Sequence, residues 1–358
     1  MNYSPISHAK SIFYKKDPLQ LTLFLTARCN ASCPFCFYLS EEKRNAVLEE
    51  LSLEEIQKIS ASMGSLLWLA FSGGEIFLRK DIVEISETFY RNNTPSIMLF
   101  PTNGLLPDII HDRMEEILNI CSKSSVVVKL SIEGPKETHD RIRGKGSFAK
   151  TMETYRALKD MNRQYENFDL GINTVFSAAN QDVMDELIES VKKMEGINTH
   201  TVSLIRGDVP DETLKEVSIS QYNDTIKKLA QNLRTETSQT YHFRGGKLKA
   251  AQDIIQRDLI YQTRLQNRQL IPCHAGKLNL VITENGDLYP CEDFSKNICN
   301  IRDHDCNISQ AMKTETARKV IADITARKCF CTHECYMMTN ILFSPAMYPR
   351  LLKELIAL

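Results

Sequence analysis

The sequence predicts an α/β fold in which a parallel sheet of six strands, closed or partly closed, carries helices on its outer side. Three observations lead to this prediction. Apolar, strand-like runs alternate with helix-like segments from residue 19 to residue 205. Glycine and polar residues follow these runs instead of preceding them. A cysteine-rich, irregular segment occupies residues 271–358. Strands that are joined through helices pair in parallel, with the helices packed outside the sheet.

The predicted elements follow one another in a regular order. The six strand-like runs span residues 19–27, 65–72, 96–102, 126–132, 169–176 and 200–205. The helical patterns between them lie at about 52–63, 80–92, 107–120, 147–165 and 180–195. Ser52, followed three residues later by Glu55, has the pattern of a capping box and marks the start of the first helix.

The chain changes character after Arg206. Residues 207–270 are polar with helical patterns, and we interpret them as a helical connection. Two short strands around Asn285 and Gly286 predict a hairpin at 277–291. We therefore expect an N-terminal extension at 1–17, a barrel-like unit at 18–206, the connection at 207–270 and a small domain at 271–358.

The composition excludes several function classes. The 358 residues contain 42% hydrophobic and 25% charged side chains, which are ordinary values for a soluble protein. A net charge of −1 provides no field that would attract a membrane surface or nucleic acid. No apolar run resembles a signal peptide or a membrane span, so we expect a cytoplasmic protein. In that reducing compartment, eleven cysteines favour metal binding or catalysis over disulfides.

The loop after the first strand holds Cys29, Cys33 and Cys36 within "CNASCPFC". Thiolates select zinc, copper(I) or iron–sulfur clusters, and structural zinc takes four protein ligands. Three thiolates are therefore either part of a zinc site or the ligands of a [4Fe–4S] cluster that keeps one iron open. Three further segments follow the next strands: "GGE" (73–75), "NG" (103–104) and "EGPKETHDRIRG" (133–144). We expect all four segments on one face, because parallel α/β folds gather their active sites at the carboxyl ends of strands.

The spacing C-x3-C-x2-C with an aromatic residue next resembles the signature of radical S-adenosylmethionine (SAM) enzymes. The resemblance implies a partial (β/α)6 TIM-like barrel whose three cysteines hold a [4Fe–4S] cluster, with SAM on the fourth iron. Reductive cleavage of SAM would give a 5′-deoxyadenosyl radical that abstracts a hydrogen atom from the substrate.

The resemblance also implies residues that bind SAM. Gly73, Gly74 and Glu75 match the family's GGE motif, which would hold the methionine amino group, although Ile76 stands where proline is common. The remaining matches are Ser131 and Arg143 for the ribose or the methionine carboxylate, Tyr38 for a backbone contact with adenine, and Asn103 on the same face. Arg141 competes with Arg143, and Ser131 could equally be a core or turn hydroxyl.

The C-terminal cysteines resemble the auxiliary-cluster region of the SPASM and twitch subfamilies. The cysteines concerned are Cys273, Cys291, Cys329, Cys331 and Cys335. The run is shorter than a full SPASM run, which implies one auxiliary [4Fe–4S] cluster of the twitch kind. Five cysteines are candidates for the four ligand positions of this cluster, and Cys329 is either surplus or a substitute for Cys331. The alternative to an iron–sulfur cluster is a structural zinc knuckle. Cys299 and Cys306 are expected to be free thiols, and Cys121 part of the core.

Glu292 directly follows Cys291. In some SPASM enzymes an acid at this place acts as the base during substrate oxidation, so Glu292 is the candidate catalytic residue. The alternative is that Glu292 is solvated or only supports the cluster.

These features together predict a radical SAM oxidoreductase or maturase that modifies or oxidises a peptide or protein side chain. One alternative is a radical SAM enzyme acting on a small molecule such as a sugar, aminoglycoside or nucleoside. A more distant one is a non-catalytic iron–sulfur or zinc scaffold or electron carrier, which would need no amino-acid pocket of the "GGE" kind. Because only 28 residues precede Cys29, we expect either a separate peptide-presenting protein or a small substrate. A low-potential electron donor such as flavodoxin or ferredoxin is also expected.

Overall fold

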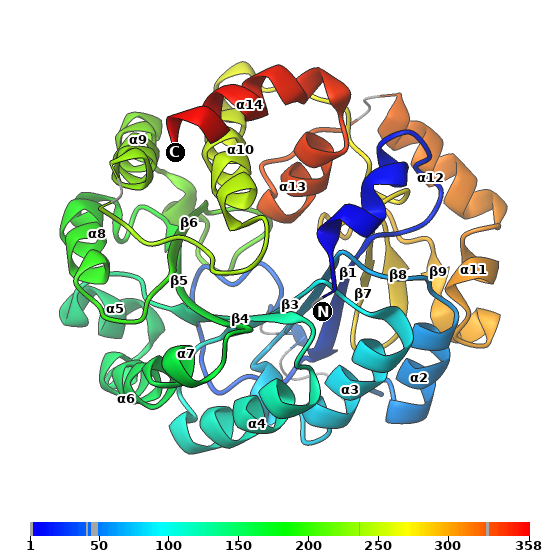
Figure 1. Ribbon diagram of the computed structural model, residues 1–358, viewed down its shortest axis with the longest axis horizontal. Coiled ribbons are helices and arrows are strands. Elements are labelled where there is room, and N and C mark those ends of the chain that lie inside the picture. Colours follow the sequence, from blue (N-terminus) through cyan, green and yellow to red (C-terminus); the bar gives the residue numbers. More distant parts are fainter. Residues whose placement is uncertain (1–2, 41, 44–48, 236, 327–328) are drawn as a thin grey trace.

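The computed structural model describes residues 3–40, 42–43, 49–235, 237–326 and 329–358. Within these ranges, a single curved sheet of nine strands runs in the order β6-β5-β4-β3-β2-β1-β7-β8-β9. Strands β1 to β5 each pair in parallel with the next strand along the chain, which ends this part of the sheet at β6. Figure 1 shows helices around the outside of the sheet. The predicted α/β fold with a partly closed barrel of six parallel strands is thereby confirmed.

The six strands of the barrel lie where the sequence predicts them. They are β1 (Gln20–Thr26), β2 (Trp68–Gly73), β3 (Ile97–Thr102), β4 (Ser125–Ser131), β5 (Phe168–Phe176) and β6 (Thr199–Leu204). Their apolar residues are buried on the side that faces the helices, as in Leu21, Leu23 and Leu25 of β1. Every residue of β1 is buried, because the sheet is covered on both faces.

The outer helices differ in two places from the sequence prediction. The full set is α2 (Leu53–Ala61), α3 (Ile82–Asn93), α4 (Pro107–Ile120), α5 (Lys136–Arg143), α6 (Ser147–Lys159), α7 (Met161–Gln164) and α8 (Met184–Lys192). The segment expected at 147–165 is divided at Asp160 into α6 and α7. Helix α5 forms inside the segment that the sequence indicated only as a loop, and it ends where Gly144 takes a positive φ of 108°.

Helices from the second half of the chain fill the open side of the barrel. They include α9 (Ile219–Arg234), α10 (Gly246–Gln266), α13 (Glu334–Leu342) and α14 (Tyr348–Ala357). In Figure 1, α10, α13 and α14 lie between β6 and the N-terminal segment. Polar side chains of α10, among them Gln252, Gln256 and Arg257, are buried there. No helix in the described part of the chain is long and apolar enough to cross a membrane.

The predicted hairpin is present and belongs to the same sheet. Strand β7 (Asn279–Ile282) pairs in parallel with β1, and β8 (Asp287–Tyr289) and β9 (Cys299–Asn300) continue antiparallel. Two further helices, α11 (Ile308–Ala311) and α12 (Glu315–Thr325), follow. The domain boundaries at 17, 206 and 270 remain predictions, but the strands of segment 271–358 extend the barrel's own sheet.

Candidate active site at the carboxyl ends of the strands

The three cysteines of the first loop lie between β1 and α2 and are half-buried. The Cys36 backbone N–H donates to the Cys33 carbonyl oxygen at 3.2 Å, which folds this part of the loop into a turn. The Leu39 N–H points at the Cys36 sulfur at 3.3 Å, and the Asn103 side-chain amide lies 3.8 Å from the Cys29 sulfur. Donors aimed at sulfur stabilise the thiolate form that a metal requires.

Gly73 and Gly74 form a turn at the end of β2, which we call the glycine turn, and this turn packs directly against the cysteine loop. The Gly74 N–H donates to the Thr26 carbonyl at 2.7 Å, and the Glu75 N–H donates to the Arg28 carbonyl at 2.9 Å. A Cβ atom on Gly74 would lie 2.0 Å from the Arg28 carbonyl oxygen, which no side chain tolerates. Gly74 is therefore required for the close approach of two backbones.

Glu75 joins the ends of β2 and β3. The side chain is buried, and its oxygens accept hydrogen bonds from the Thr102 hydroxyl and the Asn103 N–H, each at 2.8 Å. The Phe77 N–H adds a longer contact at 3.3 Å. Burial raises the pKa of Glu75 to about 6, although these donors favour the charged form. A carboxylate has room for further donors, so these contacts do not exclude an added ligand amine.

Asn103 extends from the end of β3 to the cysteine loop. Its amide group donates to the Asn30 side-chain oxygen at 2.8 Å, and its own oxygen accepts from the Leu105 N–H at 2.9 Å. The residue is buried. Asn103 therefore fixes the start of the cysteine loop against the strand ends.

Arg143, at the end of α5, is held by Glu133. Its Nε and Nη2 atoms donate to one Glu133 oxygen at 2.9 and 2.6 Å, and the other oxygen accepts from the Val175 N–H at 2.8 Å. The guanidinium lies 5.3 Å from the centre of the Phe35 ring in the cysteine loop. Burial opposes the positive charge, but the Cys33 thiol and the Glu133 carboxylate raise the pKa of Arg143 overall.

The competing residue Arg141 and the candidate Ser131 differ from Arg143 in their surroundings. Arg141 is exposed and donates to the Ala179 carbonyl at 2.9 Å. Ser131 ends β4 beside Asn173 of β5, on the edge that carries the other strand-end segments. Between the two arginines, Arg143 is the one that contacts the cysteine loop.

The Tyr38 side chain points toward the β7–β8 hairpin. Its ring packs 4.2 Å from Phe24, and its hydroxyl donates to the buried Glu284 carboxylate. The Lys43 ammonium lies 3.6 Å from the centre of the Tyr38 ring and 3.3 Å from Glu284. The Tyr38 hydroxyl and ring are therefore held by these partners, and the contact of its backbone with adenine remains a prediction.

Four of the C-terminal cysteines line one cavity. They are Cys273, Cys291, Cys329 and Cys331, and the cavity of about 40 Å³ is also lined by His333 and Tyr336. Burial, together with the nearby Cys273 and Cys329 thiols, raises the pKa of Cys331 to about 12. The side chain of Cys335 lies outside the described residues, although its backbone belongs to α13.

The remaining cysteines lie away from both groups. Cys299 is in β9, Cys306 is buried in the main core and Cys121 caps the end of α4. All ten cysteines whose side chains are described are free of disulfides. Among the described residues, no three Cys, His, Asp or Glu side chains converge closely enough to ligate a single metal ion. A [4Fe–4S] cluster requires no such convergence, because each thiolate binds a different iron.

Glu292 is buried and forms an ion pair with Arg206, the second residue after β6. Their nearest N and O atoms are 2.5 Å apart, and the Arg206 guanidinium lies 4.2 Å from the centre of the Phe37 ring. Arg206 also approaches His333 at 3.4 Å. A cavity of about 310 Å³, lined by Phe37, Glu292 and Phe294 among others, opens beside this pair.

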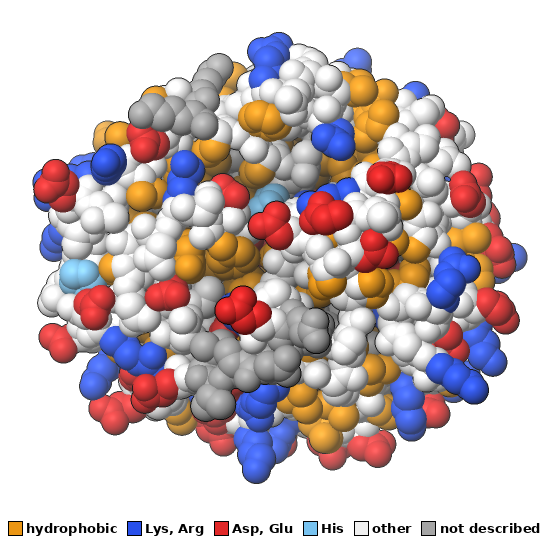
Figure 2. Space-filling view, turned by 180° about the vertical axis from the view of Figure 1, so that it is seen from behind, with side chains coloured by type: hydrophobic (Ala, Val, Ile, Leu, Met, Phe, Trp, Pro, Cys, Tyr) orange, Lys and Arg blue, Asp and Glu red, His pale blue; other side chains and the backbone are white. Residues whose placement is uncertain are grey.

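The surface is also hollowed on one side of the molecule. In the view from behind, Figure 2 shows hydrophobic side chains exposed in a hollow near the middle, with Asp and Glu side chains along its upper edge. Such a hollow, apolar inside with polar groups at the rim, is typical of a ligand-binding cleft.

Comparison with known proteins agrees with this geometry. Residues 23–187 match the family model of the radical SAM superfamily. These residues form a radical SAM domain. The domain holds the cysteine loop, the glycine turn and Arg143, so the predicted resemblance is confirmed.

The radical SAM domain also has curated relatives. The chain is 31% identical over 180 residues to the sporulation killing factor maturation protein SkfB of Bacillus subtilis (strain 168), covering 48% of this chain and 39% of that protein. It is 33% identical over 177 residues to the Fe-coproporphyrin III synthase of Methanosarcina barkeri (strain Fusaro / DSM 804), covering 48% of this chain and 40% of that one. The matches thus span less than half the length of these relatives.

A solved structure shares the fold over nearly the whole chain. The structure of anSMEcpe with bound AdoMet superposes with a TM-score of 0.60 at 18% identity, covering 95% of this chain and 98% of that one. At this identity the similarity establishes the fold, which includes the region after residue 187.

The residues of the radical SAM domain fit the two groups that such domains hold. Three thiols on one loop form the soft donor set that an iron–sulfur cluster requires. The glycine turn leaves a backbone cradle that a Cβ atom would fill. The buried Glu75 and the half-buried Arg143 provide opposite charges for an amine and a carboxylate.

Three residues of this site were not predicted from the sequence. Glu133 holds Arg143, Arg206 pairs with Glu292, and Glu284 accepts from Tyr38. Glu133 and Arg206 each follow a strand by two residues, and that strand-end position is the signal that could have identified them. Glu284 follows the short strand β7 in the same way, but its partner Tyr38 is far away in the sequence.

Proposed function

We propose that this chain is a radical SAM enzyme of the twitch or SPASM type that modifies or oxidises a peptide or protein side chain. The carrying observation is that the cysteine loop, the glycine turn, Glu75 and Asn103 meet where β1, β2 and β3 end. When bound and reduced, the cluster supplies the electron that cleaves SAM to 5′-deoxyadenosyl radical and methionine, and the radical removes a hydrogen atom from the substrate.

In this proposal the chain's own residues bind and orient SAM. Cys29, Cys33 and Cys36 hold the cluster, and the backbone of Gly73 and Gly74 receives the methionine part. Arg143, fixed in place by Glu133, faces the methionine carboxylate with its remaining donors. Ser131 would contact the ribose, and the Tyr38 backbone would contact adenine. These roles remain predictions that the geometry supports.

The second group of cysteines supports one auxiliary [4Fe–4S] cluster. Cys273, Cys291, Cys329 and Cys331 line a common cavity, and four thiols are what one cluster requires. Cys335 stays a candidate ligand, so the assignment of four places to five cysteines remains open. The cluster would accept an electron from the substrate radical or bind the substrate.

A peptide substrate is favoured by the name of one relative, a maturation protein. The name of the other, a coproporphyrin synthase, supports the small-molecule alternative. A flavodoxin or ferredoxin as electron donor, a separate peptide-presenting protein and a cytoplasmic location remain predictions.

The decisive experiment is anaerobic reconstitution with iron and sulfide, followed by SAM and dithionite. We expect the wild-type chain to form 5′-deoxyadenosine and the Cys33→Ala variant to form none, because its cluster lacks one of three ligands. Cys299→Ala is the matched control, since Cys299 lies on β9 away from both cysteine groups. Absence of product from the wild type, or equal product from Cys33→Ala, would refute the proposal.

Glu292 remains the candidate base. The salt bridge to Arg206 fixes it beside the cavity, where one carboxylate oxygen can take a proton from the oxidised substrate. The Glu292→Gln variant should still form 5′-deoxyadenosine but stall before the modified product, measured by mass spectrometry of the substrate. Unchanged turnover would show that Glu292 has only a supporting role.

A further inference from the structure

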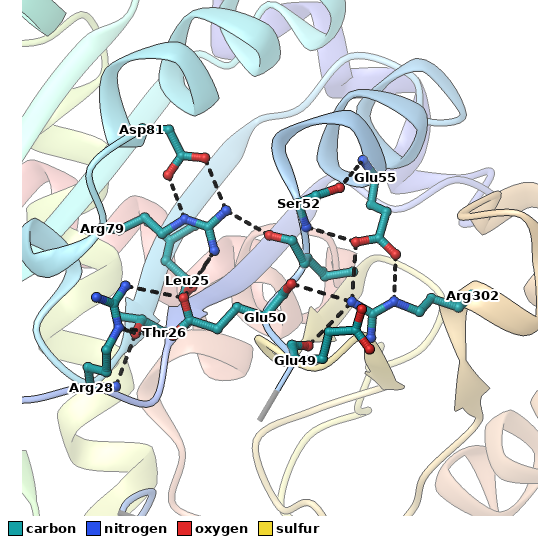
Figure 3. A network of polar contacts seen from close by, with 11 residues as sticks. Leu25, Thr26, Arg28, Glu49, Glu50, Ser52, Glu55, Arg79, Asp81 and Arg302 are labelled. Carbon is teal, nitrogen blue, oxygen red and sulfur yellow. Dashed lines mark hydrogen bonds and ion pairs between the residues drawn. The ribbon is translucent and has the colours of Figure 1, made fainter. Parts of the chain in front are cut away.

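A network of charged side chains encloses the end of the cysteine loop, where the chain enters α2 (Figure 3). We call it the loop-exit network and define it by Glu50, Glu55, Arg79 and Arg302. Glu50 lies at the loop exit, whereas Glu55 is in the first turn of α2, and Arg79 and Arg302 come from more distant elements. Arg302 belongs to the short 3-10 helix η5 (Ile301–His304) after β9 and lies beyond residues 23–187.

Arg79 closes the base of the loop. Its guanidinium donates to the Leu25 carbonyl at 3.2 Å and to the Leu51 carbonyl at 2.7 Å, the two points where the chain leaves and re-enters the barrel. Asp81 holds the same guanidinium at 2.6 Å, and Glu50 lies 3.4 Å from it. The Arg79 side chain is buried, and its bonds to the two carbonyls are formed away from water, whereas Asp81 and Glu50 are partly exposed.

Arg302 holds the loop exit from the opposite side. It forms a two-bond ion pair with Glu55 at 2.5 and 3.2 Å, and donates to the Asn285 carbonyl at 2.9 Å. The Glu49 and Glu50 carbonyls lie 3.3 and 3.4 Å from its Nη2 atom. One guanidinium therefore joins the loop exit, the first turn of α2 and the β7–β8 hairpin.

Glu55, which pairs with Arg302, also caps the N-terminus of α2. Its carboxylate accepts from the Ser52 N–H at 2.8 Å, which completes the capping box of α2. Glu50 in turn reaches back to Arg28, next to Cys29, with 3.2 Å between the charged groups. The network thus extends from Arg302 to the residue beside the first cysteine.

We propose that Arg302 is a positioning residue for the cysteine loop of the radical SAM domain. It fixes the loop exit to the hairpin that leads to Cys291, so the arrangement of the three thiols depends on a residue outside the domain. This inference rests on the proposed function only in assuming that the loop holds the cluster that SAM binds. Outer partners of metal ligands alter metal affinity about tenfold or more without touching the metal.

The test compares reconstituted wild-type protein with the Arg302→Met and Arg302→Lys variants. We expect Arg302→Met to weaken the SAM-induced change in the electron paramagnetic resonance spectrum of the reduced cluster, with SAM affinity about tenfold lower. Loss of iron to a chelator should accelerate in parallel. For both measurements we expect Arg302→Lys to give values between those of the wild type and Arg302→Met. The lysine ammonium keeps the positive charge near Glu55 but cannot donate to all the carbonyls at once.

Two further variants separate positioning from folding. Arg318→Met is the control, since Arg318 is exposed on α12 and, among the described residues, donates locally to the Lys313 carbonyl at 2.9 Å. Glu55→Gln keeps an acceptor for Ser52 but removes the charge that faces Arg302, so it should shift the spectrum in the same direction. It serves as the readout if Arg302→Met fails to fold.

The outcomes are distinguishable. A SAM-dependent spectrum that is the same in wild type, Arg302→Met and Glu55→Gln overturns this inference and leaves the proposed function intact. Equal losses in Arg302→Met and Arg318→Met overturn it as well. A wild-type protein whose spectrum never responds to SAM overturns the proposed function itself.

Discussion

Gly74 illustrates how a single residue determines the geometry of the site. With no side chain, it lets the end of β2 pass under the cysteine loop, where a Cβ atom would lie 2.0 Å from the Arg28 oxygen and 3.1 Å from the Cys29 Cβ. Gly73 beside it has a φ of 118°, which only glycine adopts without strain. The "GGE" motif is thus a steric requirement as well as a family signature.

We predict that Gly74→Ala lowers the free energy of unfolding by about 2 kcal/mol, because the loop backbone must move away from the added methyl group. Iron retention after reconstitution should fall as well. The matched control is Gly64→Ala, where nothing lies within 4 Å of the added Cβ atom. Thermal denaturation and iron content measure both effects. Equal behaviour of the two variants would contradict the steric argument.

At this scale the sequence identifies residues whose signal is local. The three cysteines, the "GGE" segment and Asn103 lie in short motifs, and the structure brings them together at the strand ends. The pairs around these residues were not predicted. Arg206–Glu292 and Tyr38–Glu284 connect segments far apart in the chain, and Glu133 meets Arg143 only because helix α5 forms between them. Such pairs depend on the folded sheet and have no spacing of their own.

At the scale of a single element, strand β4 places a buried lysine, Lys129, inside the barrel. Lys129 of β4 is buried, and its ammonium donates to the hydroxyls of Thr199 and Thr201 on β6, reaching Thr201 at 3.1 Å. To reach them it passes over Gly171 of β5, where a Cβ atom would lie 2.7 Å from the nitrogen. Burial lowers the pKa of Lys129 to about 7.

This shift predicts a pH dependence of stability. The unfolded chain binds the lysine proton up to its ordinary pKa of 10.5, whereas the folded chain releases it above about 7. Wild-type stability should therefore fall as pH drops from 10 to 7, because the unfolded state takes up more protons. The Lys129→Met variant lacks this titrating group. Its free energy of unfolding relative to that of the wild type should therefore increase as the pH falls from 10 to 7. Urea unfolding at several pH values measures it.

The control for this prediction is Lys227→Met, at an exposed position on α9. Its stability difference from wild type should stay constant with pH. A constant difference for Lys129→Met as well would mean that the buried lysine stays charged in the folded protein at all these pH values.

At the scale of elements, the alternation of apolar and polar segments identified all six strands of the barrel. The prediction missed α5, because the segment 133–144 is dominated by charged residues and has no apolar stripe. It also joined α6 and α7, since a one-residue break at Asp160 leaves the helical pattern intact. Helix bounds depend on such local breaks more than on periodicity.

For the whole molecule, two separate cysteine groups predict two clusters. We expect about eight irons per reconstituted chain, four for each [4Fe–4S] cluster. Cys33→Ala and Cys291→Ala should each retain about four, the first losing the SAM-dependent spectrum and the second keeping it. About four irons in the wild type would exclude the auxiliary cluster, and about twelve would indicate a full SPASM arrangement.

The arrangement of the whole chain was less predictable than its parts. The sequence indicates a separate small domain after residue 270, and its hairpin is present, but nothing local shows that β7 pairs with β1. That pairing joins residues 20–23 to 279–282, and parallel pairs form through backbone groups that every sequence possesses. Only the open edge of β1 could have suggested a further strand.

The position of β1 between β2 and β7 has a consequence for biosynthesis. β1 (Gln20–Thr26) is translated well before β7 (Asn279–Ile282), which is one of its two neighbours in the sheet. Until then its edge is open, and the Leu51 N–H lacks the Glu284 carbonyl that it meets at 2.6 Å in the finished fold. The strand that precedes the cysteine loop is therefore paired on both edges only after residues 279–284 have been translated.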